Sequence, residues 1–144
     1  MGAGKRIEGC LIHKLCDLTQ GHPFYTQHLC HVLWELCEPK ASADDDMLEA
    51  AVRVLLDREG YAYTTLWESL TLTQKRFLKG LAVEAAGVKV FAGDFVRCFG
   101  LGSASNVQRA VQRLLAKDII DRDTGSFLIT DRFFRLWIRT AQTA

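Results

Sequence analysis

Long apolar runs, internal repeats and low-complexity tracts are all missing from this sequence of 144 residues. No stretch approaches the roughly 20 consecutive apolar residues that a membrane-spanning helix needs. No charged-then-apolar signal segment opens the chain either. These absences predict a cytoplasmic protein with no membrane partner. Hydrophobic residues make up 49% and charged residues 24%, a globular composition with room for one ordinary domain or two small ones.

Metal-binding cysteine pairs are missing as well. The cysteines number five, and no Cys-x-x-Cys pair occurs, although histidines lie close by in His13-x-x-Cys16 and Cys30-His31. Structural zinc sites use closely spaced pairs of ligands, so we predict no metal site. Free cysteines instead behave as small hydrophobic residues, and we expect reduced, buried side chains at Cys10, Cys16, Cys30, Cys37 and Cys98.

The chain also lacks the parts of a nucleotide-hydrolysing or nucleophilic active site. Residues 2–5 are Gly-Ala-Gly-Lys, like the end of a phosphate-binding P-loop. However, the earlier glycine and the Ser or Thr after the lysine, which holds Mg²⁺, are missing. No Walker B pattern and no nucleophile–base pair at a recognisable spacing occurs. We therefore predict that this chain is not an enzyme by itself, has no catalytic residue and holds no cofactor.

Charge is divided unevenly along the chain, although the net charge is only +1. Residues 1–71 carry six basic and eleven acidic side chains, whereas residues 72–144 carry twelve basic and six acidic ones. An acidic half joined to a basic half predicts two modules with different partners.

Two helices joined at Gly21-His22-Pro23 are expected near the start. The first has an apolar stripe at Ile7, Leu11, Leu15 and Leu18. Gly21 suits a helix end because glycine adopts the left-handed conformation without steric cost. Pro23 suits the first turn of the next helix, where its missing N–H is no loss. The second helix is apolar over most of its surface, so we expect a mostly buried helix with Trp34 in the core.

Two more helices are expected before residue 71, after a polar connection over residues 39–46. Apolar residues between 47 and 56 mark the third helix, which we expect to end near Gly60. A fourth covers residues 63–70 and buries Trp67. Residues 1–60 are thus predicted to form a small helical bundle.

The second half has the order of a winged helix-turn-helix. Thr71 and Gln74 have capping-box spacing before the first helix, and Val88 and Val90 mark a short β-like patch. A short helix covers residues 94–99. A glycine turn at 100–102 follows, and Ser103 caps the third helix. Two strands, 119–122 and 126–129, are joined by Asp123-Thr124-Gly125, and an Asp131-capped helix closes the chain. The predicted fold class is mainly α, with a helical bundle over residues 1–60 and a winged helix-turn-helix with a short β-hairpin over residues 61–144.

The order of several motifs resembles the C-terminal part of the STAND and archaeal-type P-loop ATPases, which are relatives of the AAA+ proteins. The matching blocks are LTQGHPFYTQHL, LWESLTLTQKRFLKGLA, SASNVQRAVQRLLAKDII and ITDRFFRLWIR. The resemblance implies that residues 1–60 are a helical lid, with Gly21, His22 and Pro23 as the GxP motif near the nucleotide. It also implies that ATP and Mg²⁺ belong to a parent protein, whose ATPase core would be a partner of this chain.

Arginine, glutamine and asparagine on the third helix of the winged unit could read base edges, and serine at the helix N-terminus could hold phosphates. The candidate binding residues are Ser103, Ser105, Asn106, Gln108, Arg109, Gln112, Arg113, Lys117 and, on the wing, Arg122. The last helix adds a second basic stripe at Arg132, Arg135 and Arg139.

Three functions remain open on these observations. The first is an ATPase lid and winged helix that couple nucleotide state to binding of duplex DNA or a protein. The second is a free-standing winged-helix DNA-binding transcriptional regulator. The third is a protein-interaction module without a nucleic-acid role.

Overall fold

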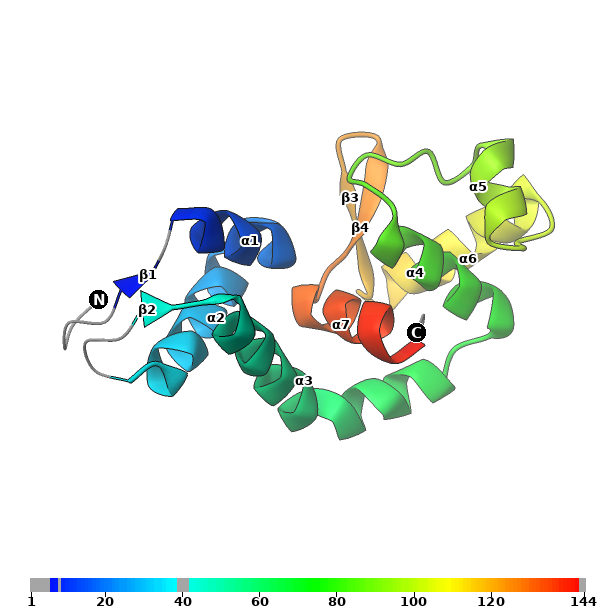
Figure 1. The fold of residues 1–144 in the computed structure, drawn as a ribbon. Helices are drawn as coiled ribbons and strands as arrows, with labels where there is room; N and C mark the ends of the chain where they lie inside the picture. The colour runs from blue at the N-terminus through cyan, green and yellow to red at the C-terminus, as the bar shows by residue number, and fades with distance from the viewer. Residues whose placement is uncertain (1–5, 8, 39–41, 143–144) are drawn as a thin grey trace. The chain divides into compact units, whose positions relative to one another are not determined.

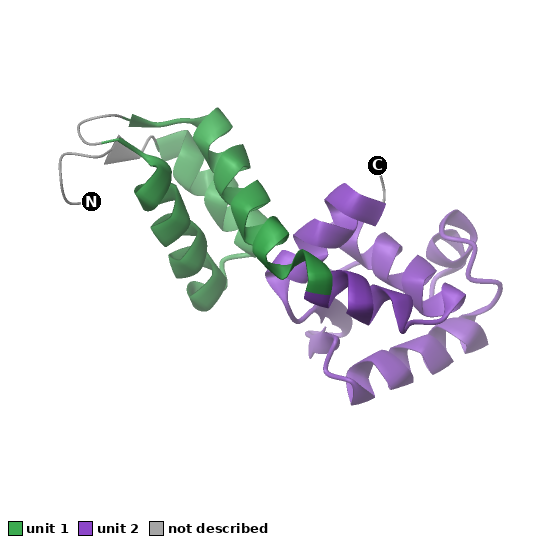
Figure 2. Ribbon diagram, turned by 90° about the horizontal axis from the view of Figure 1, so that it is seen from below, with its two compact units in different colours: residues 1–61 green, residues 62–144 purple. Residues whose placement is uncertain are grey.

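The computed structural model describes residues 6–7, 9–38 and 42–142. Within these ranges it contains seven α-helices and two pairs of short strands (Figure 1). This arrangement confirms the predicted mainly α fold class. The chain divides into two compact units, Met1–Tyr61 and Ala62–Ala144, coloured separately in Figure 2. None of the described helices combines the length and apolar character needed to cross a membrane.

The first unit contains helices α1 (Gly9–Thr19) and α2 (Pro23–Leu36) and the first part of α3 (Asp45–Glu68). Its core side chains are Leu11, Leu15, Leu29, Val32, Leu33, Leu48, Ala51 and Leu55. Strands β1 (Arg6–Ile7) and β2 (Ser42–Ala43) pair in parallel. The prediction that Ile7 belongs to the first helix is therefore wrong. The motif at residues 2–5 and the polar connection at 39–41 lie outside the described residues.

The Gly21-His22-Pro23 corner forms as its residue types predict. Gly21 has a φ of +70°, and its N–H donates to the Cys16 carbonyl at 2.9 Å, which closes the end of α1. His22 caps α2 through Nδ1, which accepts from the Phe24 N–H, and Pro23 occupies the first turn.

Helix α3 does not end at Gly60, contrary to the sequence prediction, and continues to Glu68. A glycine inside a helix costs only about 1 kcal/mol relative to alanine. Buried Leu56, Tyr63 and Trp67 keep the helical spacing on both sides of Gly60. Burial of each such side chain contributes about 1.5–3 kcal/mol, so packing outweighs the glycine.

Several burial predictions for the first half hold only in part. Trp67 is buried, with 6% of its surface exposed, whereas Trp34 is only half-buried. Phe24 is 62% exposed, so α2 buries one face rather than its whole surface. Of the five cysteines only Cys37 is buried, while Cys10 and Cys98 are exposed. None of them forms a disulfide, and no cluster of three or more potential metal ligands occurs among the described residues.

The second unit has the winged-helix order. It begins with three helices, α4 (Leu72–Val83), α5 (Gly93–Cys98) and α6 (Ala104–Ala116). Two antiparallel strands follow, β3 (Ile120–Asp123) and β4 (Ser126–Ile129). Helix α7 (Arg132–Trp137) follows and runs into a π-helical turn, η1 (Ile138–Gln142). The largest fully buried side chains of this unit are Phe77, Leu78, Leu114, Ile120, Ile129, Phe134 and Ile138.

Local side-chain chemistry explains most boundaries of this unit. The Thr71–Gln74 capping box begins α4, Ser103 caps α6 and Asp131 caps α7. The hairpin differs from the prediction, because two residues rather than three join its strands. Thr124 and Gly125 both have positive φ, 45° and 80°, as a tight primed turn requires.

The predicted β-like patch at Val88 and Val90 is not a strand. Instead, the Val88 carbonyl accepts a hydrogen bond from the Ser126 hydroxyl at 2.9 Å, and Val90 is buried. The loop that contains these valines is therefore held against the hairpin by a side-chain hydrogen bond and does not pair in a sheet.

Candidate functional site

A groove of about 300 Å³ lies between the N-terminal end of α4 and one face of α6. Its lining residues are Thr71, Thr73, Gln74, Asn106, Arg109, Ala110 and Arg113. The walls come from segments that are more than thirty residues apart in the chain, and both belong to the second unit. The groove therefore joins part of the predicted binding face to the start of α4, whose residues were not among the predicted binding residues.

The apolar spacing of α6 fixes which side chains reach the groove. Val107, Val111 and Leu114 are buried on its inner face. Residues two positions away from these, such as Arg109 and Arg113, consequently lie on the outer face. Both arginines are exposed, as predicted.

Asn106 and Ser103 have structural roles beside the groove. The Ser103 hydroxyl accepts from the Asn106 N–H, and Asn106 Nδ2 donates to the Leu101 carbonyl at 3.2 Å. Asn106 Oδ1 in turn accepts from Arg109 Nη2 at 2.6 Å. A Cβ at Gly102, which has a φ of +84°, would lie 2.9 Å from Asn106 Nδ2. This short network positions the Arg109 guanidinium at the edge of the groove.

The groove is cationic. Helix α6 contains no acidic residue, and neither Arg109 nor Arg113 forms an ion pair within the described parts of the chain. The N-terminal end of α4 adds a partial positive charge from its helix dipole. An anion in this groove would thus meet two guanidinium groups and no nearby carboxylate of α6.

The remaining predicted residues lie outside the groove. Ser105, Gln108 and Gln112 are exposed on α6, and Lys117 is exposed directly after it; none of the four lines the groove. Arg122 is exposed on the hairpin, with its guanidinium carbon 5.7 Å from the centre of the Phe127 ring. Acidic Asp121 and Asp123 flank Arg122. The hairpin, residues 120–129, therefore has a formal net charge of −1 rather than a positive one.

Sequence reasoning missed Thr71, Thr73 and Gln74 as groove residues. The capping-box pattern correctly placed a helix N-terminus at Thr71, and such ends favour anions. Nothing in the linear sequence says that this end lies beside Arg109, because that proximity depends on tertiary packing.

The Gly21-His22-Pro23 corner belongs to the first unit and is a separate candidate. Gly21 and Pro23 are exposed and His22 is half-buried. The corner is held by a 2.7 Å contact between the hydroxyls of Thr19 and Thr26. Aromatic rings gather at the start of α2, where the Phe24 ring packs edge-on against Tyr25 at 5.1 Å. The corner is thus held in one conformation by hydrogen bonds, and its Gly21 and Pro23 are accessible to solvent.

Comparison with known proteins gives one match. A family model described as a probable winged helix domain matches residues 61–140. No curated protein matches the chain. No solved structure matches it either.

Proposed function

Because the chain belongs to the probable winged helix domain family, we propose that its second unit binds duplex DNA through the α6 groove. We also propose that the chain is the C-terminal regulatory part of a STAND/AAA+-like P-loop ATPase. In such a protein a helical lid would couple nucleotide state to the winged helix.

The observation that carries the DNA proposal is that the groove contains two arginines, neither of which forms an ion pair with the described residues. Arg109 and Arg113 lie on the outer face of α6, the helix that corresponds to the recognition helix of this fold. Planar guanidinium groups hydrogen-bond to phosphates as well as attracting them. The acidic residues beside Arg122 weaken contacts from the wing. We therefore expect modest affinity, with α6 rather than the hairpin making the main phosphate contacts.

We predict that replacing both groove arginines, Arg109→Ala with Arg113→Ala, weakens binding of a fluorescent duplex at least about tenfold, or ~1.4 kcal/mol. The matched control is Arg53→Ala with Arg58→Ala, since these exposed α3 residues remove the same charge from the first unit. Fluorescence anisotropy at low salt measures both variants. Equal losses in the two variants would mean that only net charge matters. No binding by the unmodified protein would favour the protein-interaction module.

The ATPase proposal is supported by the corner and by the order of the motifs around it. Gly21, His22 and Pro23 form a preshaped, exposed turn, which suits the nucleotide-proximal position that the resemblance implies. ATP and Mg²⁺ would then be held mainly by the parent's ATPase core. The direct test is the gene: a reading frame that encodes a P-loop upstream of residue 1 supports the proposal. A frame that starts at residue 1 favours a free-standing winged-helix regulator.

We predict that this chain alone neither hydrolyses ATP nor binds ATP·Mg²⁺ with micromolar affinity. The reason is that its sequence lacks a complete phosphate loop, and such loops and their Mg²⁺ ligands position the phosphates in P-loop enzymes. Isothermal titration calorimetry and a phosphate-release assay measure the two properties. Micromolar binding or steady turnover by the pure chain would contradict the assignment of nucleotide chemistry to a separate core.

A further inference from the structure

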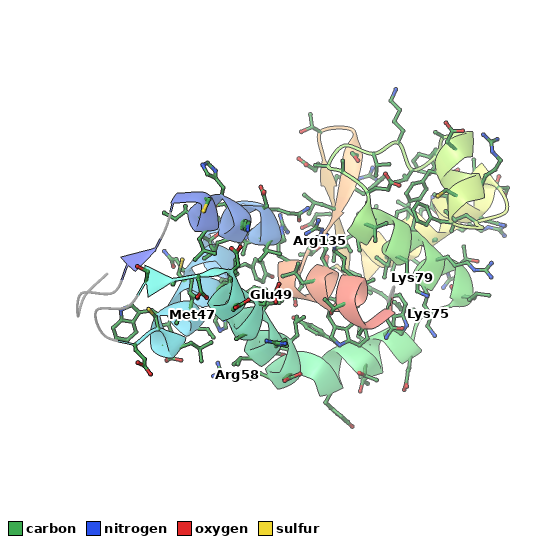
Figure 3. All side chains as sticks on the ribbon, in the orientation of Figure 1. Met47, Glu49, Arg58, Lys75, Lys79 and Arg135 are labelled. Carbon is green, nitrogen blue, oxygen red and sulfur yellow. The ribbon has the colours of Figure 1, made fainter. Side chains whose placement is uncertain are left out.

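Three arginines lie along one side of the last helical segment, on a surface different from the α6 groove. Arg132, Arg135 and Arg139 are spaced i, i+3 and i+7, so they fall on one helical face. Five other residues of the segment are apolar and buried, namely Phe133, Phe134, Leu136, Trp137 and Ile138. Arg135 is labelled on this segment in Figure 3. Within the basic stripe predicted from the sequence, Arg132 and Arg135 are half-buried.

Part of the Arg135 guanidinium is removed from water without a hydrogen bond in return. Its Nε and Nη1 atoms are buried and form no hydrogen bond. Burial lowers the pKa of the Arg135 guanidinium, and the like charges of Arg139 and Arg132 lower it further. Arginine nevertheless keeps its charge in proteins. Such a partly buried cation is costly to the fold, because its two buried nitrogens bond neither to water nor to a counter-ion.

The carboxylate nearest to Arg135 in the sequence, Asp131, is hydrogen-bonded to other groups. Asp131 Oδ1 accepts from the N–H groups of Phe133 and Phe134. Its Oδ2 accepts from the Tyr63 hydroxyl at 2.9 Å. Arg132 uses Nη1 to donate to the carbonyls of Ile129 and Thr130, while its buried Nε also has no partner. No acidic residue occurs from 132 to 142.

We infer that the half-buried face of α7 at Arg132 and Arg135 is a docking site for carboxylate side chains of a protein partner. Charge complementarity requires an anion there. Arg135 is only partly covered, and the limited access to its guanidinium favours a group at the end of a slender side chain, such as Asp or Glu. The phosphates of a duplex lie on a broad, stiff surface and suit the exposed arginines of α6 better. Arginine is also enriched at the centres of protein interfaces.

The site can be tested with an alanine-based helical peptide that carries glutamates at i and i+4 spacing, against the same peptide with glutamine. The readout is the NMR signal of the Arg135 Nε–H group, assigned by its disappearance in Arg135→Lys. We expect the glutamate peptide to shift this signal, and the glutamine peptide to leave it unchanged. We also expect Arg135→Lys to weaken peptide binding about tenfold, because lysine keeps the charge but loses the planar fork.

A stability measurement separates a binding role from a structural one. Arg135→Met is expected to raise the melting temperature of the second unit, because methionine fills the site without an uncompensated charge, and to abolish peptide binding. A lower melting temperature in this variant would overturn the inference, since the guanidinium would then support the fold. Unaltered peptide affinity in Arg135→Lys would overturn it too. So would a duplex DNA that shifts the Arg135 signal at lower concentration than the peptide does. A failure of the proposed DNA binding at the α6 groove would not count against this site, because the two surfaces consist of different residues.

Discussion

Replacing Trp67 with alanine is expected to lower the free energy of unfolding of the second unit by about 3–5 kcal/mol. Trp67 is only 6% exposed. Its ring packs edge-on against Trp137 at 6.1 Å, and the Lys79 ammonium lies 5.9 Å from its centre. The substitution thus removes a large buried surface, an aromatic pair and a cation–π contact together. Urea unfolding followed by far-UV circular dichroism measures the loss.

Trp34→Ala is the matched control, because the same side chain is only half-buried on α2. We expect it to cost no more than about half as much as Trp67→Ala, in proportion to the smaller area that it hides. If Trp34→Ala proved the more destabilising of the two, the burial of these two tryptophans would be assigned wrongly.

The same Gly→Ala substitution is expected to have opposite effects at Gly80 and at Gly60. A Cβ at Gly80 would lie 2.7 Å from Phe99 Cδ2 and 2.8 Å from Phe95 Cζ. Those rings pack together at 4.8 Å, so a methyl group must push them apart. Such overpacking costs about 1–3 kcal/mol and outweighs the gain of about 1 kcal/mol from helix propensity.

Gly60 has no atom within 4 Å of its added Cβ, so only the propensity gain remains. We expect Gly60→Ala to stabilise the protein by about 0.5–1 kcal/mol, which leaves the two variants about 1–3 kcal/mol apart, the overpacking cost at Gly80. Thermal unfolding of both measures the difference. Destabilisation by Gly60→Ala would contradict a continuous α3 through that residue, because alanine would then disturb a bend or a helix end.

Features that depend on a few neighbouring residues could be predicted from the sequence. The Gly21–Pro23 corner, the Thr71–Gln74 capping box and the Ser103 cap all involve residues within four positions of one another. The outer face of α6 was also predictable, because burial follows the 3.6-residue period. The order of these local signals was sufficient to predict a winged helix.

Features that depend on tertiary packing could not be predicted. Gly60 resembles a helix end, and only the buried residues on both sides of it show that α3 continues. Val88 and Val90 resemble a strand, but the Val88 carbonyl instead accepts a hydrogen bond from Ser126 in the hairpin, almost forty residues later. Arg135 resembles an exposed arginine, and its lost hydration depends on the packing around α7. The groove likewise depends on the long-range approach of α4 to α6.

The salt dependence of DNA binding tests the central proposal most directly. Each phosphate neutralised by a basic side chain contributes about −0.9 to the slope of log K against log salt concentration. If Arg109 and Arg113 each hold a phosphate, removing both should flatten the slope by about two units. The Arg53/Arg58 control should leave it unchanged. An identical slope in the unmodified protein and the Arg109/Arg113 variant would contradict phosphate binding in the α6 groove.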